Sequence, residues 1–405
     1  MTSDAPTAPA EGVAENNPLR LPALTGLRIF AALAVYLSHL PPPHSASKTL
    51  TGFLEAGYMG VTLFFVLSGF VLALNHFEDM SRPSVRATWQ FGVARFARIY
   101  PIYVLVLFYI LVRQHVFGAA IGGWWEHALA LQAWNPNVFQ AFSFNGPAWS
   151  VSVEVFLYAC FPLLVPLIAR LRTPRALLVA GAAVSLVMAG LALWFVLSHR
   201  AGLPWSDPES AHRWLYVTPL TRVGDFVLGI LAARLYLSAR KRPRVVRAGG
   251  PVAIASIAVI LLLMAWPANL FSAWSWDLAY ALPSLLLIFG LSVAPRSGPA
   301  RMLSVPLIVL LGESSYAFYL IHVPALNYFG AGRWAVGVSP STLVFEALTL
   351  GAILCLAVGL HVAIERPARV YIRRVLGSDP RRALNRRTGA PPPGDAPDRA
   401  VAAKT

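Results

Sequence analysis

The sequence predicts an all-α polytopic membrane protein with about ten transmembrane helices and both termini in the cytoplasm. Of its 405 residues, 57% are hydrophobic and only 13% are charged, which is about half the charged share of a soluble domain. Apolar residues gather in long segments, and basic residues gather between alternate segments. Membrane helices joined by cytoplasmic loops produce this arrangement.

Ten apolar segments are long enough to cross a bilayer, which takes about twenty residues in a helix. The segment that begins at residue 251 has the weakest pattern, and the others show clear apolar runs. The ten segments are residues 21–40, 57–76, 99–117, 149–169, 176–198, 215–238, 251–267, 278–294, 304–328 and 342–364.

Loop charges give the orientation of these segments. With the N-terminus inside, the only arginines in the outer loops are Arg200, Arg213 and Arg333, and the other loop arginines lie inside. A missed or additional span would break this alternation, so the charges favour ten spans with both termini cytoplasmic. The net charge of +15 therefore suits anionic lipid at the cytoplasmic membrane and not nucleic acid.

The ends of the chain differ from its middle in composition. Residues 1–20 are predicted to be a disordered cytosolic leader, residues 21–369 a membrane domain, and residues 370–405 a basic, Pro-rich, disordered cytosolic tail. Cys160 and Cys355 fall inside apolar segments, where cysteines are usually reduced packing residues. No metal-ligand spacing occurs, so we expect no metal site.

Arg28 and His39 lie eleven residues apart in the first segment, close to three helical turns. Both side chains should project from one helix face, roughly 16 Å apart along the axis. Ionisable side chains are costly inside a membrane and indicate a functional site. The guanidinium suits an anion and the imidazole suits proton transfer, although a helix-end histidine at the lipid headgroups is the alternative for His39.

Arg95 and Arg98 lie one turn apart where the third segment begins, after a second segment whose Ser68 and Gly69 favour close helix packing. Paired guanidinium forks match phosphate oxygens. The preference for basic residues at the cytoplasmic side explains two arginines here equally well.

The fourth segment opens with Trp149-Ser150-Val151-Ser152-Val153-Glu154 and enters from the outer side. Glu154 should therefore lie at the depth of His39, where a carboxylate could orient the imidazole and stabilise its charged form. A solvated glutamate at the membrane interface is the alternative.

Two later segments also carry polar side chains. Arg222 and Asp225 are three residues apart in the sixth segment and should form a helix ion pair with a scaffolding role. Tyr316, Tyr319 and His322 fall within two turns in the ninth segment. A packing or hydrogen-bonding role suits His322 better than catalysis.

Together these segments resemble the acyltransferase-3 family of integral membrane acyltransferases. The matches run in order from about Leu21 to Arg369, and six successive motifs are specific. Asp225 stands where the family often has Glu, which keeps the charge. The motifs are Arg-x10-His, Phe-Phe-Val-Leu-Ser-Gly-Phe, Arg-x2-Arg-Ile-x-Pro, Trp-Ser-x-Ser-x-Glu-x-Phe, Gly-x-x-Ser-Tyr-x-x-Tyr-Leu-x-His-x-Pro and a closing Glu-Arg-Pro.

The resemblance implies transfer of an acyl group, commonly acetyl from acetyl-CoA, to a hydroxyl of a carbohydrate, glycolipid or secondary metabolite. Arg28, His39 and Glu154 would be catalytic, and Arg95 and Arg98 would bind acyl-CoA together with Arg28. Acyl-CoA is a co-substrate, and we expect no permanently bound cofactor. His39 would act as the general base or would carry the acyl group itself. Substrate-binding or structural positions would be Trp149, Ser150, Ser152, Arg222, Asp225, Tyr316 and His322.

Two other kinds of protein fit the same composition. A transporter or flippase of a lipid-linked sugar would use these charges as a gate, and inverted repeats and ion coupling would mark it. The sequence shows no such repeat. A protein-interaction scaffold would leave Arg28 and His39 unexplained.

Overall fold

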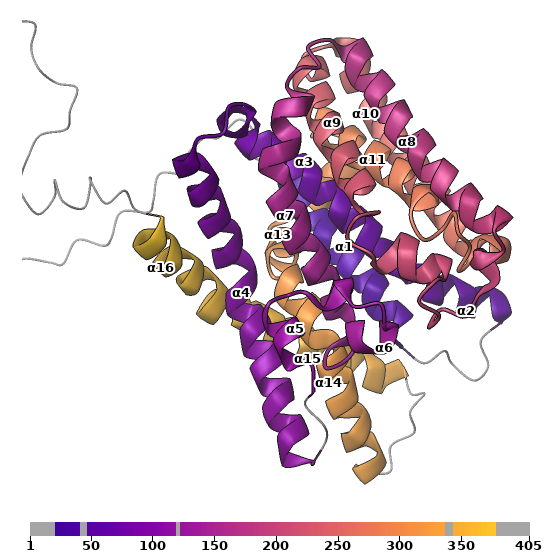
Figure 1. Cartoon of the computed structure of the whole chain (residues 1–405), viewed down its shortest axis with the longest axis vertical. Coiled ribbons are helices and arrows are strands. Elements are labelled where there is room, and N and C mark those ends of the chain that lie inside the picture. Colours follow the sequence, from indigo (N-terminus) through magenta and orange to yellow (C-terminus); the bar gives the residue numbers. More distant parts are fainter. Residues whose placement is uncertain (1–20, 41–46, 119–121, 337–342, 378–405) are drawn as a thin grey trace, which may run out of the picture.

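The described part of the chain is helical throughout. The computed structural model describes residues 21–40, 47–118, 122–336 and 343–377, and no β-strand occurs in these ranges. The long helices pack side by side in one bundle (Figure 1). They are α1 (Pro22–Ser38), α3 (Gly60–Ser81), α4 (Val85–Val116), α7 (Trp149–Ile168), α8 (Pro174–Leu197), α9 (Val223–Ala239), α10 (Pro243–Ala265), α11 (Leu278–Val293), α14 (Ser315–Val336) and α15 (Leu343–Leu360).

Shorter helices connect or extend the long ones. The α-helical pieces are α2 (Lys48–Glu55), α5 (Trp124–Ala128), α6 (Val138–Ala141), α12 (Gly298–Leu303), α13 (Pro306–Glu313) and α16 (Arg366–Leu376). The 3₁₀ and π turns are η1 (Ala56–Met59), η2 (Gln132–Trp134), η3 (Gly146–Ala148), η4 (Arg200–Gly202), η5 (His212–Val217), η6 (Pro267–Asn269) and η7 (His361–Glu365).

The predicted segments fall on helices, with two departures: the sixth, residues 215–238, is divided between η5 and α9, which begins only at Val223, and the ninth falls on the pair α13 and α14. By length and composition six helical stretches could cross a membrane, and α13 with α14, bent by 64°, would make seven. α1 and α11 are apolar but have only 17 and 16 residues, or about 25 Å of helix against a hydrocarbon core of about 30 Å. A multi-helix membrane architecture follows, while the count of ten and the side of the termini stay predictions.

α4 begins earlier than the sequence predicts. The apolar pattern places the third span at residues 99–117, but the helix starts at Val85 because Ser84 caps it. The Ser84 side chain accepts the backbone N–H of Ala87 at 3.1 Å. Arg95 and Arg98 therefore lie well inside a helix and not ahead of one.

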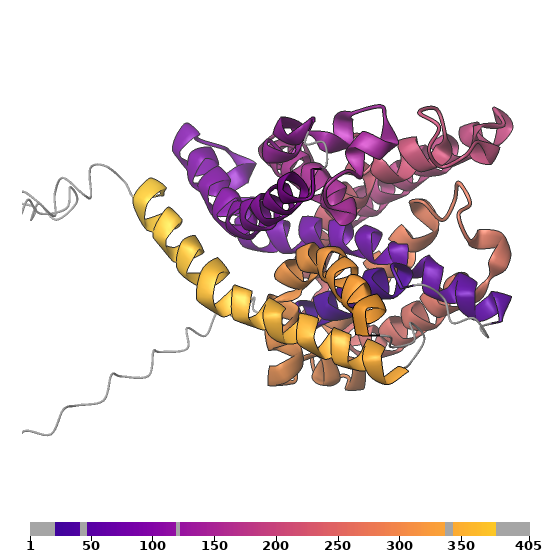
Figure 2. The same cartoon turned by 90° about the horizontal axis from the view of Figure 1, so that it is seen from below.

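The last helix also continues past its predicted end. α15 passes through η7 into α16, which reaches Leu376 although the sequence predicts a disordered tail from residue 370. α16 runs along α4 at the edge of the bundle (Figures 1 and 2), and the Trp89 indole donates to the Leu376 carbonyl at 3.1 Å. This contact helps to stabilise α16, which extends beyond the apolar residues of the last predicted segment. The predicted leader, residues 1–20, and most of the predicted tail, residues 378–405, lie outside the described ranges.

Glycines bring the central helices into backbone contact. A Cβ atom on Gly69 of α3 would lie 2.1 Å from the carbonyl oxygen of Phe226 on α9, and one on Gly229 of α9 would lie 2.1 Å from that of Val66. This confirms the close packing predicted for the second segment. A Cβ atom on Gly26 of α1 would lie 2.0 Å from the carbonyl oxygen of Leu303, the last residue of α12. This last contact holds the helix that carries Arg28 and His39.

Candidate active site

Three adjoining cavities follow α1, and we name them the His39 cavity, the central cavity and the α16 cavity. Their volumes are about 330, 90 and 440 Å³, so the central cavity is the smallest of the three. The α16 and central cavities share Arg28 and Arg98 in their walls, and the central and His39 cavities share Val61 and Tyr319. The two polar residues predicted on α1 therefore border different members of one series.

The central cavity collects arginines from α1 and α4. Arg28, Arg95 and Arg98 line it together with Glu154 and Tyr158 of α7. The Arg95 guanidinium lies 5.7 Å from the centroid of the Tyr158 ring, and the Tyr158 hydroxyl donates to Glu154. Neither Arg28 nor Arg98 forms an ion pair with another described side chain. Three guanidinium groups against one carboxylate give this cavity a positive lining that suits an anionic group.

The first turns of α7 distribute one sequence motif between two cavities. Trp149 lines the His39 cavity and Glu154 lines the central cavity. Between them, the Ser150 hydroxyl donates to the Tyr319 hydroxyl at 2.8 Å, where the two cavities meet. The Ser152 hydroxyl accepts a backbone N–H of η2 at 3.4 Å. Ser150 and Ser152 therefore position the wall of the site.

His39 ends α1 at the wall of its cavity. Its Nδ1 lies 2.8 Å from the Val35 carbonyl oxygen, and because a carbonyl only accepts, this contact assigns the proton to Nδ1 and the lone pair to Nε2. His322 is arranged in the same way, with Nδ1 at 2.7 Å from the Tyr319 carbonyl oxygen. The two imidazole rings have centroids 5.1 Å apart. His39 therefore presents a basic nitrogen, with His322 buried behind it.

The structure does not place Glu154 beside His39, contrary to the expectation from shared depth. Glu154 lies about 7.5 Å along α7 from Trp149, and its carboxylate faces the arginines of the central cavity. The ring partners of His39 within the described ranges are His322 and the Val35 carbonyl. Two residues at the same depth in the membrane can project from their helices in different directions, so shared depth does not predict contact. Here the Glu154 carboxylate projects toward the arginines, whose positive charge attracts it.

Three other predicted residues have scaffold contacts. Arg222 pairs with Asp225 at 3.0 Å, with both side chains fully buried, which confirms the helix ion pair. Asp277, which sequence spacing could not find, joins the same guanidinium at 3.1 Å. Tyr316 lines the central cavity, and its buried hydroxyl donates to the Ile99 carbonyl at 3.0 Å, which ties α14 to α4.

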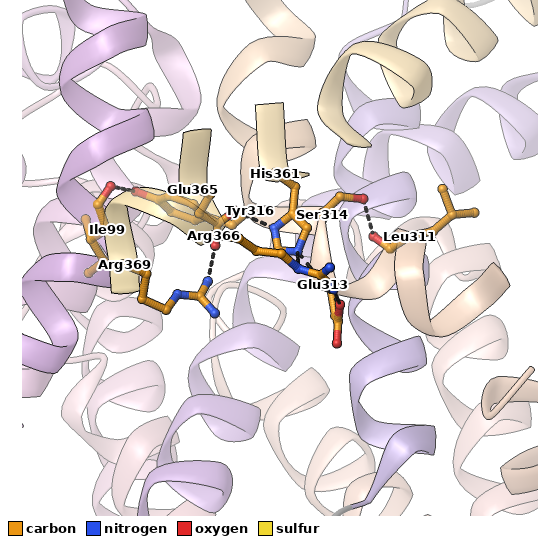
Figure 3. Close-up of polar contacts among 9 residues, drawn as sticks. All are labelled: Ile99, Leu311, Glu313, Ser314, Tyr316, His361, Glu365, Arg366 and Arg369. Carbon is orange, nitrogen blue, oxygen red and sulfur yellow. Dashed lines mark hydrogen bonds and ion pairs between the residues drawn. The ribbon is translucent and has the colours of Figure 1, made fainter. Parts of the chain in front are cut away.

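A polar network borders the α16 cavity and was not predicted (Figure 3). His361 Nδ1 donates to Glu365 at 2.8 Å, and Arg366 Nε donates to His361 Nε2 at 3.1 Å. Arg366 also pairs with Glu313, and Arg369 pairs with Glu365. The four-residue spacing of His361, Glu365 and Arg369 places them on one helix face and is the signal that could have found them.

Comparisons with known proteins agree with these motifs. The acyltransferase-3 family model, described as an acyltransferase domain, matches residues 21–363. The acyltransferase MdmB of Streptomyces mycarofaciens is 31% identical over 88% of this chain and 93% of its own length. The O-acetyltransferase OatA of Staphylococcus aureus is 24% identical over 82% of this chain, which spans 55% of that relative.

No solved structure shows a significant match to the chain. The family assignment therefore depends on sequence, and it covers both arginine motifs, His39 and the start of α7. The match over residues 21–363 and the similarity to MdmB show that this chain belongs to the acyltransferase-3 family.

Proposed function

We propose that the protein uses acyl-CoA to acylate a hydroxyl acceptor across a passage through the membrane. The observation that carries the proposal is the series of three cavities, with guanidinium groups in the middle and the His39 imidazole at one end. In such a series, an anionic donor and a neutral acceptor could enter from different cavities and meet at one reaction site. The name of OatA, an O-acetyltransferase, favours acetyl as the transferred group.

The donor would approach from the α16 cavity. Arg28, Arg95 and Arg98 supply guanidinium donors that match phosphate oxygens. The pantetheine arm would pass Arg28 and extend toward His39, roughly 16 Å further along α1 by helical rise. An extended arm is long enough for this distance, so the thioester would reach the junction marked by Tyr319.

The chemistry would use the free Nε2 of His39. As a general base, Nε2 takes the hydroxyl proton while the oxygen attacks the thioester carbonyl, the C–S bond breaks, and the imidazolium returns the proton to the CoA thiolate. Alternatively, Nε2 attacks the thioester carbonyl and the C–S bond breaks, which releases CoA as the thiolate. The acceptor oxygen then attacks the acyl group on the ring, the N–C bond breaks, and the hydroxyl proton goes to the CoA thiolate. Both routes yield an ester and free CoA.

The acceptor would occupy the His39 cavity. Glu55 is the carboxylate in its wall, and no Lys or Arg lines it among the described residues. Flat aromatic walls suit the apolar faces of sugar rings, which supports a carbohydrate, glycolipid or glycosylated metabolite over an anionic polymer. The Phe, Tyr and Trp side chains are Tyr58, Phe142, Trp149, Tyr216, Phe271, Trp276 and Tyr319.

We place the protein in the cytoplasmic membrane as a multi-pass protein with cytoplasmic termini. Leu21, near the N-terminus, lines the α16 cavity, so an N-terminus inside would open that cavity toward cytoplasmic acyl-CoA. The basic loops favour the same orientation. The His39 cavity would then face the outer side.

Release of CoA tests the proposal. The purified full chain in lipid nanodiscs receives acetyl-CoA with hydroxyl acceptors extracted from host glycans and metabolites, and free thiol is measured. We expect acceptor-dependent thiol release that His39→Ala abolishes. A transporter or flippase would release no CoA with any acceptor. The absence of thiol release with every acceptor would therefore refute the enzyme assignment. A mass increase of one acetyl group on His39 would select the covalent route.

A further inference from the structure

The α16 cavity holds two cationic side chains that the chemistry above does not use. Arg366 and Arg369, on the first turns of α16, line it together with Arg28 and Arg98. The Arg366 side chain is 50% exposed and the Arg369 side chain 29% exposed. Partly exposed arginines in the wall of a cavity that adjoins more arginines suggest a binding site for an anion of several charges.

The network in Figure 3 holds these two side chains in place. Glu365 accepts from His361 and Arg369, and His361 Nε2 accepts from Arg366 Nε, so the ring carries its proton on Nδ1 and is neutral. Arg366 is thus held at Nε and by its pair with Glu313. Its Nη1 donors stay unengaged within the described ranges, and Arg369 Nε is buried without a partner.

The charges do not cancel within the cavity. Arg28, Arg98, Arg366 and Arg369 face the carboxylates of Glu313 and Glu365, which leaves a surplus of two positive charges because His361 is neutral. A pair of clustered phosphates would neutralise this surplus. No aromatic ring other than the His361 imidazole lines the cavity among the described residues, so the site is suited to phosphate and not to stacking of a base.

We infer that Arg366 and Arg369 bind the phosphates of the 3′-phospho-ADP portion of the donor, at the opening through which acyl-CoA enters; this inference rests on the proposed function. Arg98 and Arg28, which line both the α16 and central cavities, continue the path inward. Glu313 competes with phosphate for Arg366, since both bind the same guanidinium. Glu365 positions Arg369 directly and Arg366 through His361.

Binding of acetyl-CoA and of acetyl-pantetheine, which lacks the nucleotide, to the purified full chain tests the inference by calorimetry. Arg366→Gln and Arg369→Gln should each raise the Kd for acetyl-CoA about tenfold, because each removes a charge-assisted contact, and should leave acetyl-pantetheine binding unchanged. Glu313→Gln breaks the same ion pair but frees Arg366, so it should tighten acetyl-CoA binding severalfold. Arg374→Gln, on an exposed position of α16, is the matched control.

A merely structural network predicts a different pattern. Arg366→Gln and Glu313→Gln would then weaken both ligands and lower the melting temperature alike, and the inference would be overturned. Wild-type affinity for acetyl-CoA in both Arg→Gln variants would also overturn it while leaving the donor assignment intact. If the wild-type chain binds no acetyl-CoA, the donor assignment and this inference fail together.

Discussion

A single backbone contact sets the tautomer of His39 and leaves its Nε2 available in a cavity wall. Because proton transfer by a positioned side chain contributes about 10²–10⁴-fold to a rate, His39→Ala should lower acyl transfer by at least that factor. Insertion and melting temperature should stay unchanged, since one imidazole at a helix end adds little to either. Thiol release and thermal unfolding of the purified variant are the measurements.

His115→Ala is the control for His39→Ala, because His115 is exposed on the last turn of α4. It should retain full activity. Normal turnover by His39→Ala would remove His39 from the reaction and leave the His39 cavity without a catalytic group.

Arg95 and Arg98 should act on donor affinity more than on the chemical step. Replacing both by Gln should raise the KM for acyl-CoA more than it lowers kcat, because a phosphate contact acts on ground and transition states alike. Lys at both positions should rescue only partly, because the bidentate fork is lost. Steady-state kinetics measure both effects.

Arg113→Gln, an exposed position on the same helix, controls for the loss of charge on α4. An unchanged KM in the double Gln variant would give Arg95 and Arg98 a purely topological role, as loop arginines have under the positive-inside pattern.

At the scale of elements, the contact between α3 and α9 depends on glycine. Gly69→Ala should lower the melting temperature, because the added Cβ would lie 2.1 Å from the Phe226 carbonyl oxygen and the helices must separate. Overpacking of this kind costs about 1–3 kcal/mol. Gly92→Ala on α4, where a Cβ meets nothing within 4 Å, should instead stabilise the helix by about 0.5–1 kcal/mol.

Thermal unfolding in detergent micelles compares these two variants. Opposite shifts support backbone contact as the cause, because both substitutions add the same methyl group. A drop of equal size in both variants would show instead that glycine flexibility, and not close packing, matters in these helices.

Helix positions could be predicted because apolar length and backbone satisfaction in lipid define them. The eighth segment, residues 278–294, agrees with α11 to within one residue. Helix ends failed where a polar cap or a polar face extends a helix beyond its apolar stretch, as at Val85 and Leu376. Contacts between helices could not be predicted, because the spacing of residues along the chain does not show which faces of two helices meet. Asp277, 55 residues from Arg222, is one such contact.

At the scale of the whole molecule, the arrangement of the cavities and the distribution of the loop charges both favour separate sides for donor and acceptor. The α16 cavity, with its arginines, lies at the end of α1 that carries the N-terminus, and the His39 cavity lies at the other end. In the proposed orientation, which the loop arginines favour, the first of these ends faces the cytoplasm. The proposed donor and acceptor sides therefore lie on opposite faces of the membrane.

This arrangement predicts that donor and acceptor react from opposite sides of a sealed membrane. Vesicles of known orientation receive acetyl-CoA on the cytoplasmic side and acceptor on the outer side, and the acylated product is measured. Product should form, because the acyl group reaches His39 on the pantetheine arm while the CoA nucleotide stays at the arginines. Vesicles with His39→Ala provide the background. Product formed only when both substrates share the cytoplasmic side would exclude the passage and would indicate an inner-face enzyme followed by a separate flippase.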